Sequence, residues 1–297
     1  MFEKMLLPLD GSELAETALP YIRDLSNQIG SEIYLLHVCP TEHQYYTHMH
    51  QIYLNTIAGD LRNSIKESYP DIQEPKVFYE VISGDPVKVI FDYVKRKDIS
   101  LVVATTFGTS GLGKLALGNV ADKLLRGLGI PTLLVRIPET TDAVEKRIIR
   151  MILLPVDMSE ASKTAVPYAL ELAKKLNASI TLFSMAQTVY SQNLDAVGPG
   201  VGANWDEIDK ATEKYIDENL KSIENEILAA GVQVTHTSYL GIDAGYEILE
   251  MEKRVQPDLV VMATRGRSPV TRWAFGSVAE KVLREGSKPL LLIKKKV

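Results

Sequence analysis

The sequence has little of what marks a secreted, membrane-spanning or nucleic-acid-binding protein. Its 297 residues include a single cysteine, Cys39, so no disulfide can form within the chain, which is typical of a reducing compartment. No apolar run approaches the roughly 20 residues that a membrane-spanning helix needs. The formal net charge is -5, and the basic tail Lys294–Lys296 is short and follows an apolar run. We therefore expect no membrane partner and no nucleic-acid partner.

The residues at the start of the chain also lack the apolar core of a secretory signal peptide. Pro8 interrupts the first apolar run, and Asp10 follows its end directly. Together with the single cysteine, these features predict a soluble, cytoplasmic protein.

Internal repetition is what the sequence does contain. Five segments recur in the same order, and matches at several separated places indicate a duplicated chain. The pairs are Met5–Glu13 with Ile152–Glu160, Pro20–Tyr21 with Pro167–Tyr168, Leu101–Thr105 with Leu259–Thr264, Gly118–Arg126 with Gly276–Arg284, and Pro131–Leu134 with Pro289–Leu292. Each half is long enough to bury a core of its own.

A polar stretch separates the two copies. We predict a first domain at residues 1–138, a linker at 139–146 and a second domain at 147–297. The spacing between matched segments grows along the chain, so the length differences fall in the middle of each domain. There the second copy carries the glycine-rich segment Val197–Ala203, which is typical of a loop.

Short apolar runs alternate with amphipathic segments in both copies. Most runs are rich in β-branched residues and leucine, which is typical of strands buried on both faces of a parallel sheet. They are Met5–Leu9, Ile33–Val38, Val77–Val81, Leu101–Ala104 and Thr132–Val135, then Ile149–Val156, Ile180–Ser184, Val232–Tyr239, Leu259–Ala263 and Leu290–Ile293. The predicted helices are Leu14–Gln28, Pro86–Lys95 capped by Asp85, Val120–Gly127 and Gly245–Lys253. This alternation predicts an α/β fold of two tandem doubly wound parallel sheets, with ligands outside the carboxyl ends of the strands.

An aspartate follows the first strand of each copy, as Asp10 and Asp157. A carboxylate at this position can accept hydrogen bonds from an adenine amino group or from a ribose hydroxyl. The alternative is that each aspartate caps the next helix, with Glu13 or Glu160 completing a capping box. The two roles are compatible with each other.

The loop after the fourth strand of the second copy combines glycine with positive charge. It runs from Ala263 through Gly266 and Arg267 to Gly276 and Ser277, where a helix is predicted to begin. Glycine lets backbone N–H groups approach a phosphate closely, and a helix start adds donors and a favourable dipole. The alternative is that Ser277 is only an N-cap and that the glycines only shape the turn.

Together these features resemble the universal stress protein family. The resemblance rests on the aspartate after the first strand, on the glycine loop after the fourth, and on Gly276–Leu283 followed by a last strand that begins at Pro289. It covers nearly the whole chain, twice. It implies that both domains have a Rossmann-like fold of the adenine nucleotide alpha hydrolase-like kind.

ATP-binding members of that family carry Gly, two residues, Gly, nine residues, and then Gly with Ser or Thr. The second copy fits three of these four positions, and the first copy fits only the two inner glycines. The resemblance implies a second-copy nucleotide site formed by Pro155, Val156, Asp157, Met185, Ala263, Gly266, Arg267, Gly276, Ser277 and Val278. Its first-copy counterpart comprises Pro8, Leu9, Asp10, Val38, Thr105, Gly108, Gly118, Asn119 and Val120.

The same resemblance implies a function and an assembly. The function is a regulatory module of the stress response that binds ATP or AMP, with or without Mg²⁺, and holds no metal by protein groups alone. The family often dimerises through its last strand, which implies a homodimer or an intrachain pseudo-dimer. A slow ATPase is one alternative, although no clear general base is present beyond Asp157. A nucleotide-independent dimeric scaffold is the other, and the departures at Thr105, Asn119 and Ala263 favour it.

Two other sequence patterns resemble functional sites but are not interpreted as such. Gly108–Leu115 nearly spells a Walker A loop, but Leu115 stands where that motif needs the Ser or Thr that binds Mg²⁺. His43, His48 and His50 cluster in the sequence, but no cysteine or compact acidic group nearby completes a metal set. We therefore expect this segment to form a solvated, partly amphipathic helix.

The remaining candidates for chemistry are isolated residues. His37 and His236 lie in predicted strands, and no Ser/His/Asp triad is evident around them. Cys39 follows a strand, and His37 is the only base near it in sequence, so we interpret the thiol as inert.

Overall fold

The computed structural model describes residues 1–41, 47–70, 74–106, 117–136, 149–187, 205–265 and 275–294. The predicted linker at 139–146, the loop at 197–203 and the Walker-like segment at 108–115 lie outside these residues. The chain divides into two compact units, Met1–Ile148 with Pro289–Val297, and Ile149–Lys288. None of the helices in the described ranges is long and apolar enough to cross a membrane.

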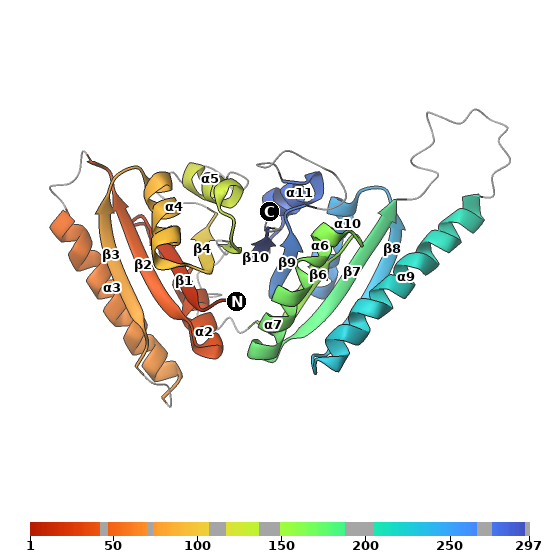
Figure 1. The fold of residues 1–297 in the computed structure, drawn as a ribbon, viewed down its shortest axis with the longest axis horizontal. Helices are drawn as coiled ribbons and strands as arrows, with labels where there is room; N and C mark the ends of the chain where they lie inside the picture. Colours follow the sequence, from red (N-terminus) through yellow and green to blue (C-terminus); the bar gives the residue numbers. More distant parts are fainter. Residues whose placement is uncertain are drawn as a thin grey trace. The chain divides into compact units, whose positions relative to one another are not determined.

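The first unit contains a mostly parallel sheet in the order β3-β2-β1-β4-β5-β10 (Figure 1). Its strands are β1 (Lys4–Leu9), β2 (Glu32–Cys39), β3 (Val77–Ser83), β4 (Leu101–Thr105), β5 (Thr132–Val135) and β10 (Leu290–Ile293). β1 pairs in parallel with β2 on one side and with β4 on the other. The strand order therefore reverses between β1 and β4, which is the switch point where such folds bind ligands.

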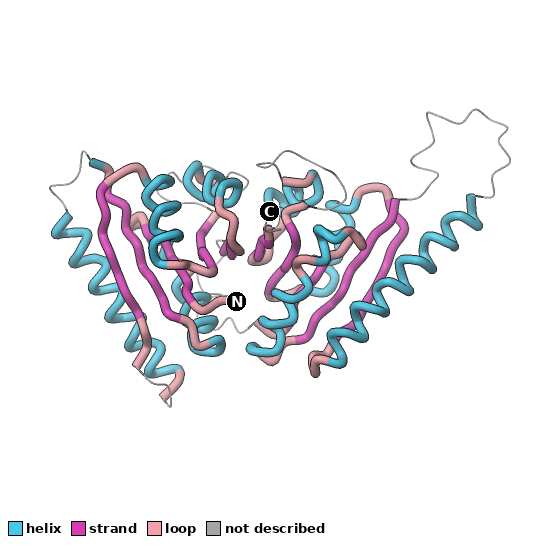
Figure 2. The backbone as a smooth tube through the Cα atoms, viewed as in Figure 1, coloured by secondary structure: helices cyan, strands magenta, loops and turns pink. Residues whose placement is uncertain are grey.

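Helices cover both faces of this sheet (Figure 2). They are α1 (Glu13–Glu16), α2 (Leu19–Ile29), α3 (Thr47–Ser68), α4 (Pro86–Lys97) and α5 (Asn119–Gly127). Leu6 and Leu36 of the sheet pack in one cluster with Tyr93 of α4 and Leu124 of α5. Side chains alternate along a strand, so the intervening positions, such as His37, face α2 and α3 on the other side.

The last strand departs from the parallel pattern. β10 comes from the end of the second repeat but belongs to the first unit, where it pairs antiparallel with β5 and sets Leu291 opposite Leu133. Lys294, which follows β10, donates a hydrogen bond from Nζ to the Arg126 carbonyl oxygen at 2.5 Å. The first sheet is therefore extended by a strand from the far end of the chain.

The second unit has a parallel sheet in the order β8-β7-β6-β9. Its strands are β6 (Met151–Pro155), β7 (Ser179–Gln187), β8 (Val234–Gly241) and β9 (Leu259–Ala263). Its helices are α6 (Glu160–Lys163), α7 (Val166–Leu176), α9 (Trp205–Ala229), α10 (Ala244–Val255) and α11 (Ser277–Glu285). α7 packs on β6 and β7, α9 packs on β7 and β8, and α10 packs against α11. The switch point of this sheet lies between β6 and β9.

Each predicted apolar run forms a strand, which confirms the α/β class, but the helix predicted at Leu14–Gln28 is interrupted. α1 ends at Glu16, and α2 begins at Leu19 with Pro20 in its first turn. Proline has no N–H to donate to the carbonyl four residues earlier, so a helix cannot run through this point undisturbed. The second copy has the same break between α6 and α7, where Pro167 lies in the first turn of α7.

Candidate functional site

The carboxyl edge of the second sheet brings the two predicted site segments together. β6 and β9 are parallel neighbours, with Ile152 opposite Leu259. Asp157, after β6, and Ala263, at the end of β9, therefore emerge at the same edge of the sheet. The backbone N–H of Gly276 donates to the Thr264 carbonyl oxygen at 2.9 Å, which places the start of α11 directly beside the end of β9.

The start of α11 has the features of an anion site. Gly276 is the N-cap, with φ -65° and ψ 150°, and as a glycine it brings no side chain of its own to cap the helix. Ser277 is the first helical residue and its side chain is exposed, so the alternative that Ser277 is the N-cap is wrong. Val278, half-buried, follows it. The first-turn N–H groups of a helix have no partner within the helix, and they can bind a phosphate or carboxylate oxygen.

Asp157 is held in a tight turn at the end of β6. Its Oδ1 accepts a hydrogen bond from the Ser159 N–H at 3.0 Å, and its own N–H donates to Ser162 Oγ at 3.2 Å. Ser159 caps α6, because its Oγ accepts from the Ser162 N–H at 3.0 Å, and Glu160 is the first helical residue. The predicted cap by Asp157, with a capping box to Glu160, is therefore wrong. The turn instead fixes a half-exposed carboxylate at the edge of the sheet.

Apolar side chains lie at the same edge of the sheet as this carboxylate. Pro155 pairs with Phe183 of β7, and the N–H of Val156 donates to the Phe183 carbonyl oxygen at 2.8 Å. Val156, Met185 and Ala263 are all buried. A planar apolar group entering this edge of the sheet would therefore meet carbon and sulfur atoms, with one carboxylate beside them.

The first unit repeats this geometry with different side chains. The N–H of Gly118 donates to the Thr106 carbonyl oxygen at 2.9 Å, and Gly118 is the N-cap of α5. Asn119, the first residue of α5, and Val120 are exposed, Pro8, Val38 and Thr105 are half-buried, and Leu9 is buried. The three remaining predicted site residues, Gly108, Gly266 and Arg267, lie outside the described residues.

Asp10 occupies the same kind of turn as Asp157. Its Oδ1 accepts from the Ser12 N–H at 3.0 Å and from Ser12 Oγ at 2.6 Å. Ser12 is the N-cap of α1, and Glu13 is the first helical residue, so the predicted capping role of Asp10 is also wrong. The carboxylate of Asp10 is exposed at the end of β1.

His37, His50 and Tyr53 form a cluster next to Leu9, the residue before this turn, and the sequence did not predict it. His37 of β2 is buried, and its Nδ1 lies 2.9 Å from the Leu9 carbonyl oxygen. Its ring stacks on His50 of α3, with centroids 4.2 Å apart and 19° between the planes. Tyr53, one helical turn further along α3, meets the His37 ring edge-on at 6.3 Å and donates its hydroxyl to Glu16 Oε1 at 2.8 Å.

The surroundings of the cluster favour neutral side chains. Burial, followed by the nearby His50, holds the pKa of His37 below its usual value, although the Leu9 carbonyl and Asp10 act in the opposite direction. Burial also raises the pKa of the Tyr53 hydroxyl, and the hydrogen bond to Glu16 adds to that shift. His37 is therefore a neutral ring at neutral pH, buried between a strand end and a helix.

The helical period was the signal that could have revealed this cluster. Buried residues of α3 recur at Leu54, Ala58, Leu61 and Ile65. His50 lies four residues before Leu54, so it shares the face that packs on the sheet. The prediction of a solvated helix considered the histidines as possible metal ligands only. Within the described ranges, no group of three or more His, Cys, Asp and Glu side chains is placed to hold a metal ion.

Comparison with known proteins agrees with this architecture. A sequence profile of the Universal stress protein family matches residues 1–136 and again residues 149–294. The chain therefore belongs to the universal stress protein family, with two family domains in tandem.

Relatives and solved structures support the assignment. Universal stress protein MJ0531 of Methanocaldococcus jannaschii is 31% identical over 155 residues, covering 50% of this chain and 85% of the relative. Universal stress protein YxiE of Bacillus subtilis is 27% identical over 148 residues, covering 46% of this chain and 100% of the relative. A crystal structure of a universal stress protein from Archaeoglobus fulgidus matches in fold with a TM-score of 0.68 at 20% identity, covering 98% of this chain and 96% of that one.

Proposed function

We propose that this chain is a regulatory module that binds an adenine nucleotide, ATP or AMP, with its principal site in the second domain. The observation that carries the proposal is the hydrogen bond from Gly276 to Thr264, which sets a helix start with a glycine N-cap beside the end of β9, the neighbour of the strand that Asp157 follows. An anion-binding helix start, a carboxylate and a buried apolar floor then meet at the switch point of one sheet.

Each part of this edge fits one part of a nucleotide. The first-turn N–H groups of α11 and the exposed Ser277 hydroxyl are donors suited to phosphate oxygens. The Asp157 carboxylate accepts from ribose hydroxyls or the adenine amino group, and the apolar side chains of Val156 and Met185 contact the base. Between these elements the sequence supplies a glycine, Gly266, and a positive charge, Arg267. Mg²⁺, where present, would bind through the nucleotide's phosphates.

The first domain offers a weaker version of the same site, comprising Pro8, Leu9, Asp10, Val38, Thr105, Gly108, Gly118, Asn119 and Val120. The N-cap of α5 is again a glycine, but Asn119 replaces the hydroxyl residue at the helix start. An amide can still donate one hydrogen bond to a phosphate. We therefore expect the second domain to bind more tightly than the first.

Calorimetric titration of the nucleotide-stripped full chain with ATP and with AMP, in the presence of Mg²⁺, tests the proposal. We expect one tight site per chain. Gly276→Val should weaken it at least tenfold, because a branched side chain would block phosphate from the helix start. Gly129→Val is the matched control, because a Cβ at Gly129 meets nothing within 4 Å and Gly129 belongs to the first unit, whereas Gly276 belongs to the second.

Different outcomes separate the competing functions. If the folded, stripped chain binds neither nucleotide, the proposal fails and a nucleotide-independent scaffold takes its place. If ATP binds but Gly276→Val binds equally well, the site is not at α11. Release of ADP at a steady turnover that Asp157→Asn abolishes would identify a slow ATPase.

A further inference from the structure

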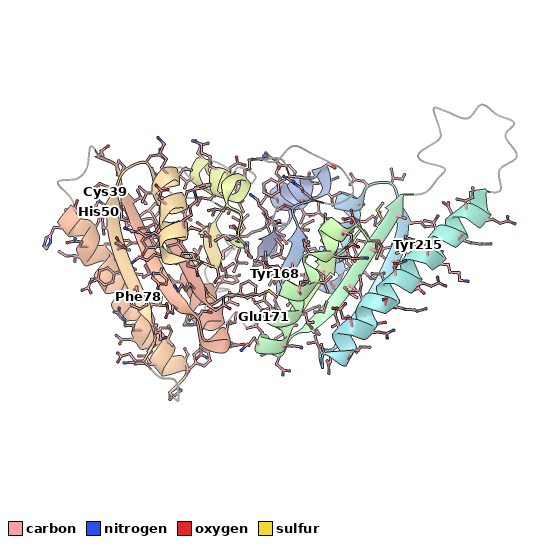
Figure 3. The ribbon with its side chains drawn as sticks, in the orientation of Figure 1. Cys39, His50, Phe78, Tyr168, Glu171 and Tyr215 are labelled. Atoms are coloured by element: carbon pink, nitrogen blue, oxygen red, sulfur yellow. The ribbon has the colours of Figure 1, made fainter. Side chains whose placement is uncertain are left out.

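A pair of stacked histidines joins three elements of the first domain at the carboxyl end of its sheet. His37 lies on β2, its hydrogen-bond partner Leu9 ends β1, and His50 lies near the start of α3. Figure 3 shows His50 on α3 beside the carboxyl end of β2, where Cys39 also lies. The pair therefore ties the first turns of α3 to the part of the sheet that carries Asp10.

The hydrogen bond to Leu9 assigns the proton on the buried ring. A carbonyl oxygen only accepts, so Nδ1 of His37 must carry the hydrogen and donate it. In the neutral ring, Nε2 is then unprotonated. A proton taken up by His37 goes to Nε2 and places a positive charge in a buried ring 4.2 Å from the His50 ring.

The second domain lacks this pair. Pro8 pairs with Leu36 and Pro155 pairs with Phe183, and Pro8 and Pro155 match in the repeat. His37 follows Leu36, and Ser184 follows Phe183. His37 and Ser184 therefore occupy equivalent positions in the two domains. Ser184 is buried but does not titrate at physiological pH.

We propose that His37 and His50 form a proton-operated latch, which holds the start of α3 on the first sheet at neutral pH and releases it in mild acid. The stack is stable while at least one ring is neutral, because two imidazolium rings in face-to-face contact repel each other and the ring of His37 is buried. The latch does not depend on the proposed nucleotide function, since no ligand takes part in it.

The charges around the pair decide the direction of the response. Asp10 after β1 and Tyr53 of α3 face the pair, and Tyr53 donates its hydroxyl to Glu16 of α1. Val81 of β3 lies opposite His37, and the charged residues Arg23 and Asp24 of α2 pair with each other. Asp10 favours a charged His37, and Glu16 is bound by the Tyr53 hydroxyl. Burial and His50 outweigh Asp10, since the pKa of His37 is lowered on balance. Acid therefore favours the opened state, in which His37 is hydrated.

Hydrogen exchange of the nucleotide-stripped full chain measures the latch directly. We expect protection factors in the first half of α3 to fall by up to about tenfold between about pH 7.5 and about pH 5.5, because the open state takes up a proton near pH 6.5 and the latched state resists it. Protection in α4, on the other face of the same sheet, should stay constant and serves as the internal reference.

Three variants separate the latch from a general loss of structure. His37→Asn keeps a donor near the Leu9 carbonyl but cannot be protonated, and His50→Phe keeps the ring stack without a second charge. His37→Asn should flatten the pH response of α3, whereas His50→Phe should reduce it without abolishing it, because the burial of His37 remains. His48→Asn is the matched control, because His48 is an exposed residue of the same helix, and its pH response should equal that of the natural protein.

Histidine NMR on the natural protein keeps the proposal testable even if a variant fails to fold. We expect His37 to show a hydrogen on Nδ1 and to protonate below pH 6.5, in the range where α3 loses protection. Constant protection of α3 across this range would overturn the proposal. An undiminished pH response in folded His37→Asn would overturn it as well. Neither result bears on nucleotide binding, because no nucleotide is present.

Discussion

The best-defined polar anchor of the second domain is Glu252, and its removal provides a stringent test of the structure. Glu252 lies on α10 and is 3% exposed. Its Oε1 accepts hydrogen bonds from the Ser287 N–H at 2.6 Å, from Ser287 Oγ at 2.7 Å and from the Lys288 N–H at 3.1 Å. One carboxylate oxygen thus fastens the turn after α11 to α10.

The expected cost follows from those three contacts. Glu252→Ala leaves two backbone N–H groups without their acceptor, at about 1–3 kcal/mol for each group that stays buried. Ser287 is exposed and Lys288 half-exposed, so water can reach the turn and recover part of that loss. We therefore expect Glu252→Ala to lower the free energy of unfolding of the second unit by about 2–3 kcal/mol. Glu252→Gln, which keeps an acceptor oxygen, should cost about 1 kcal/mol.

Urea unfolding followed by tryptophan fluorescence suits this test. Both tryptophans, Trp205 and Trp273, belong to the second copy, so the signal reports on that domain. A loss of 2–3 kcal/mol shifts the midpoint by about 1 M, for an m-value of about 1–3 kcal/mol/M. Glu285→Ala, an exposed glutamate of α11, is the control. If Glu252→Ala shifts the midpoint no further than Glu285→Ala, the buried anchor does not stabilise the domain.

Two further predictions concern local packing and helix capping. Gly127→Ala should destabilise the first domain by about 1–3 kcal/mol in thermal unfolding, because a Cβ there would lie 2.2 Å from Cζ of Phe91, whereas Gly59→Ala in open space on α3 should stabilise it by about 0.5–1 kcal/mol. Equal effects would refute the packing described around Phe91. Asp243 is the N-cap of α10, and the hydrogen bond from Lys281 lowers the pKa of its carboxyl group. The ionised carboxylate of Asp243 therefore stabilises the fold above about pH 4, and this stabilisation is lost as the pH falls through the lowered pKa. Asp243→Ala should cost about 1 kcal/mol at neutral pH, and the gap to the natural protein in unfolding curves should close in acid; a gap constant with pH would contradict this.

The fold was predictable because the same pattern of strands and helices occurs twice in the sequence. Ten apolar runs with strand composition, interrupted by amphipathic segments, leave few topologies other than a doubly wound sheet, and the duplication indicates that both halves share it. The exact membership of the sheets was harder to predict. β10 is sequentially part of the second repeat, yet it pairs with β5 in the first unit, and nothing in Leu290–Ile293 specifies its partner. An apolar four-residue strand can pair with any sheet edge that presents matching backbone groups.

The prediction of local polar interactions was less successful. Helix capping by Asp10 and Asp157 was the alternative to nucleotide contact, but Ser12 and Ser159 cap the helices instead. Aspartate and serine both have short side chains that bind nearby N–H groups. The sequence spacing therefore cannot tell whether the aspartate or the serine two residues after it is the N-cap. The structure assigns the cap to serine and leaves the aspartate carboxylate in a turn at the sheet edge. This arrangement also suits the proposed nucleotide contact better than a cap would.

The two copies share the backbone arrangement at the carboxyl edge of their sheets but differ in the side chains there. The backbone geometry of the two edges is the same, since Gly118 and Gly276 make equivalent 2.9 Å hydrogen bonds to the residue after the fourth strand of their domains. The side chains at that edge differ, with Asn119 where the second copy has Ser277, and His37 where it has Ser184. The first copy thus has an amide where the second has a hydroxyl suited to phosphate, and an imidazole suited to protons where the second has another hydroxyl. Together the two proposals let one fold, repeated within one chain, respond to two chemical signals, a nucleotide and the pH.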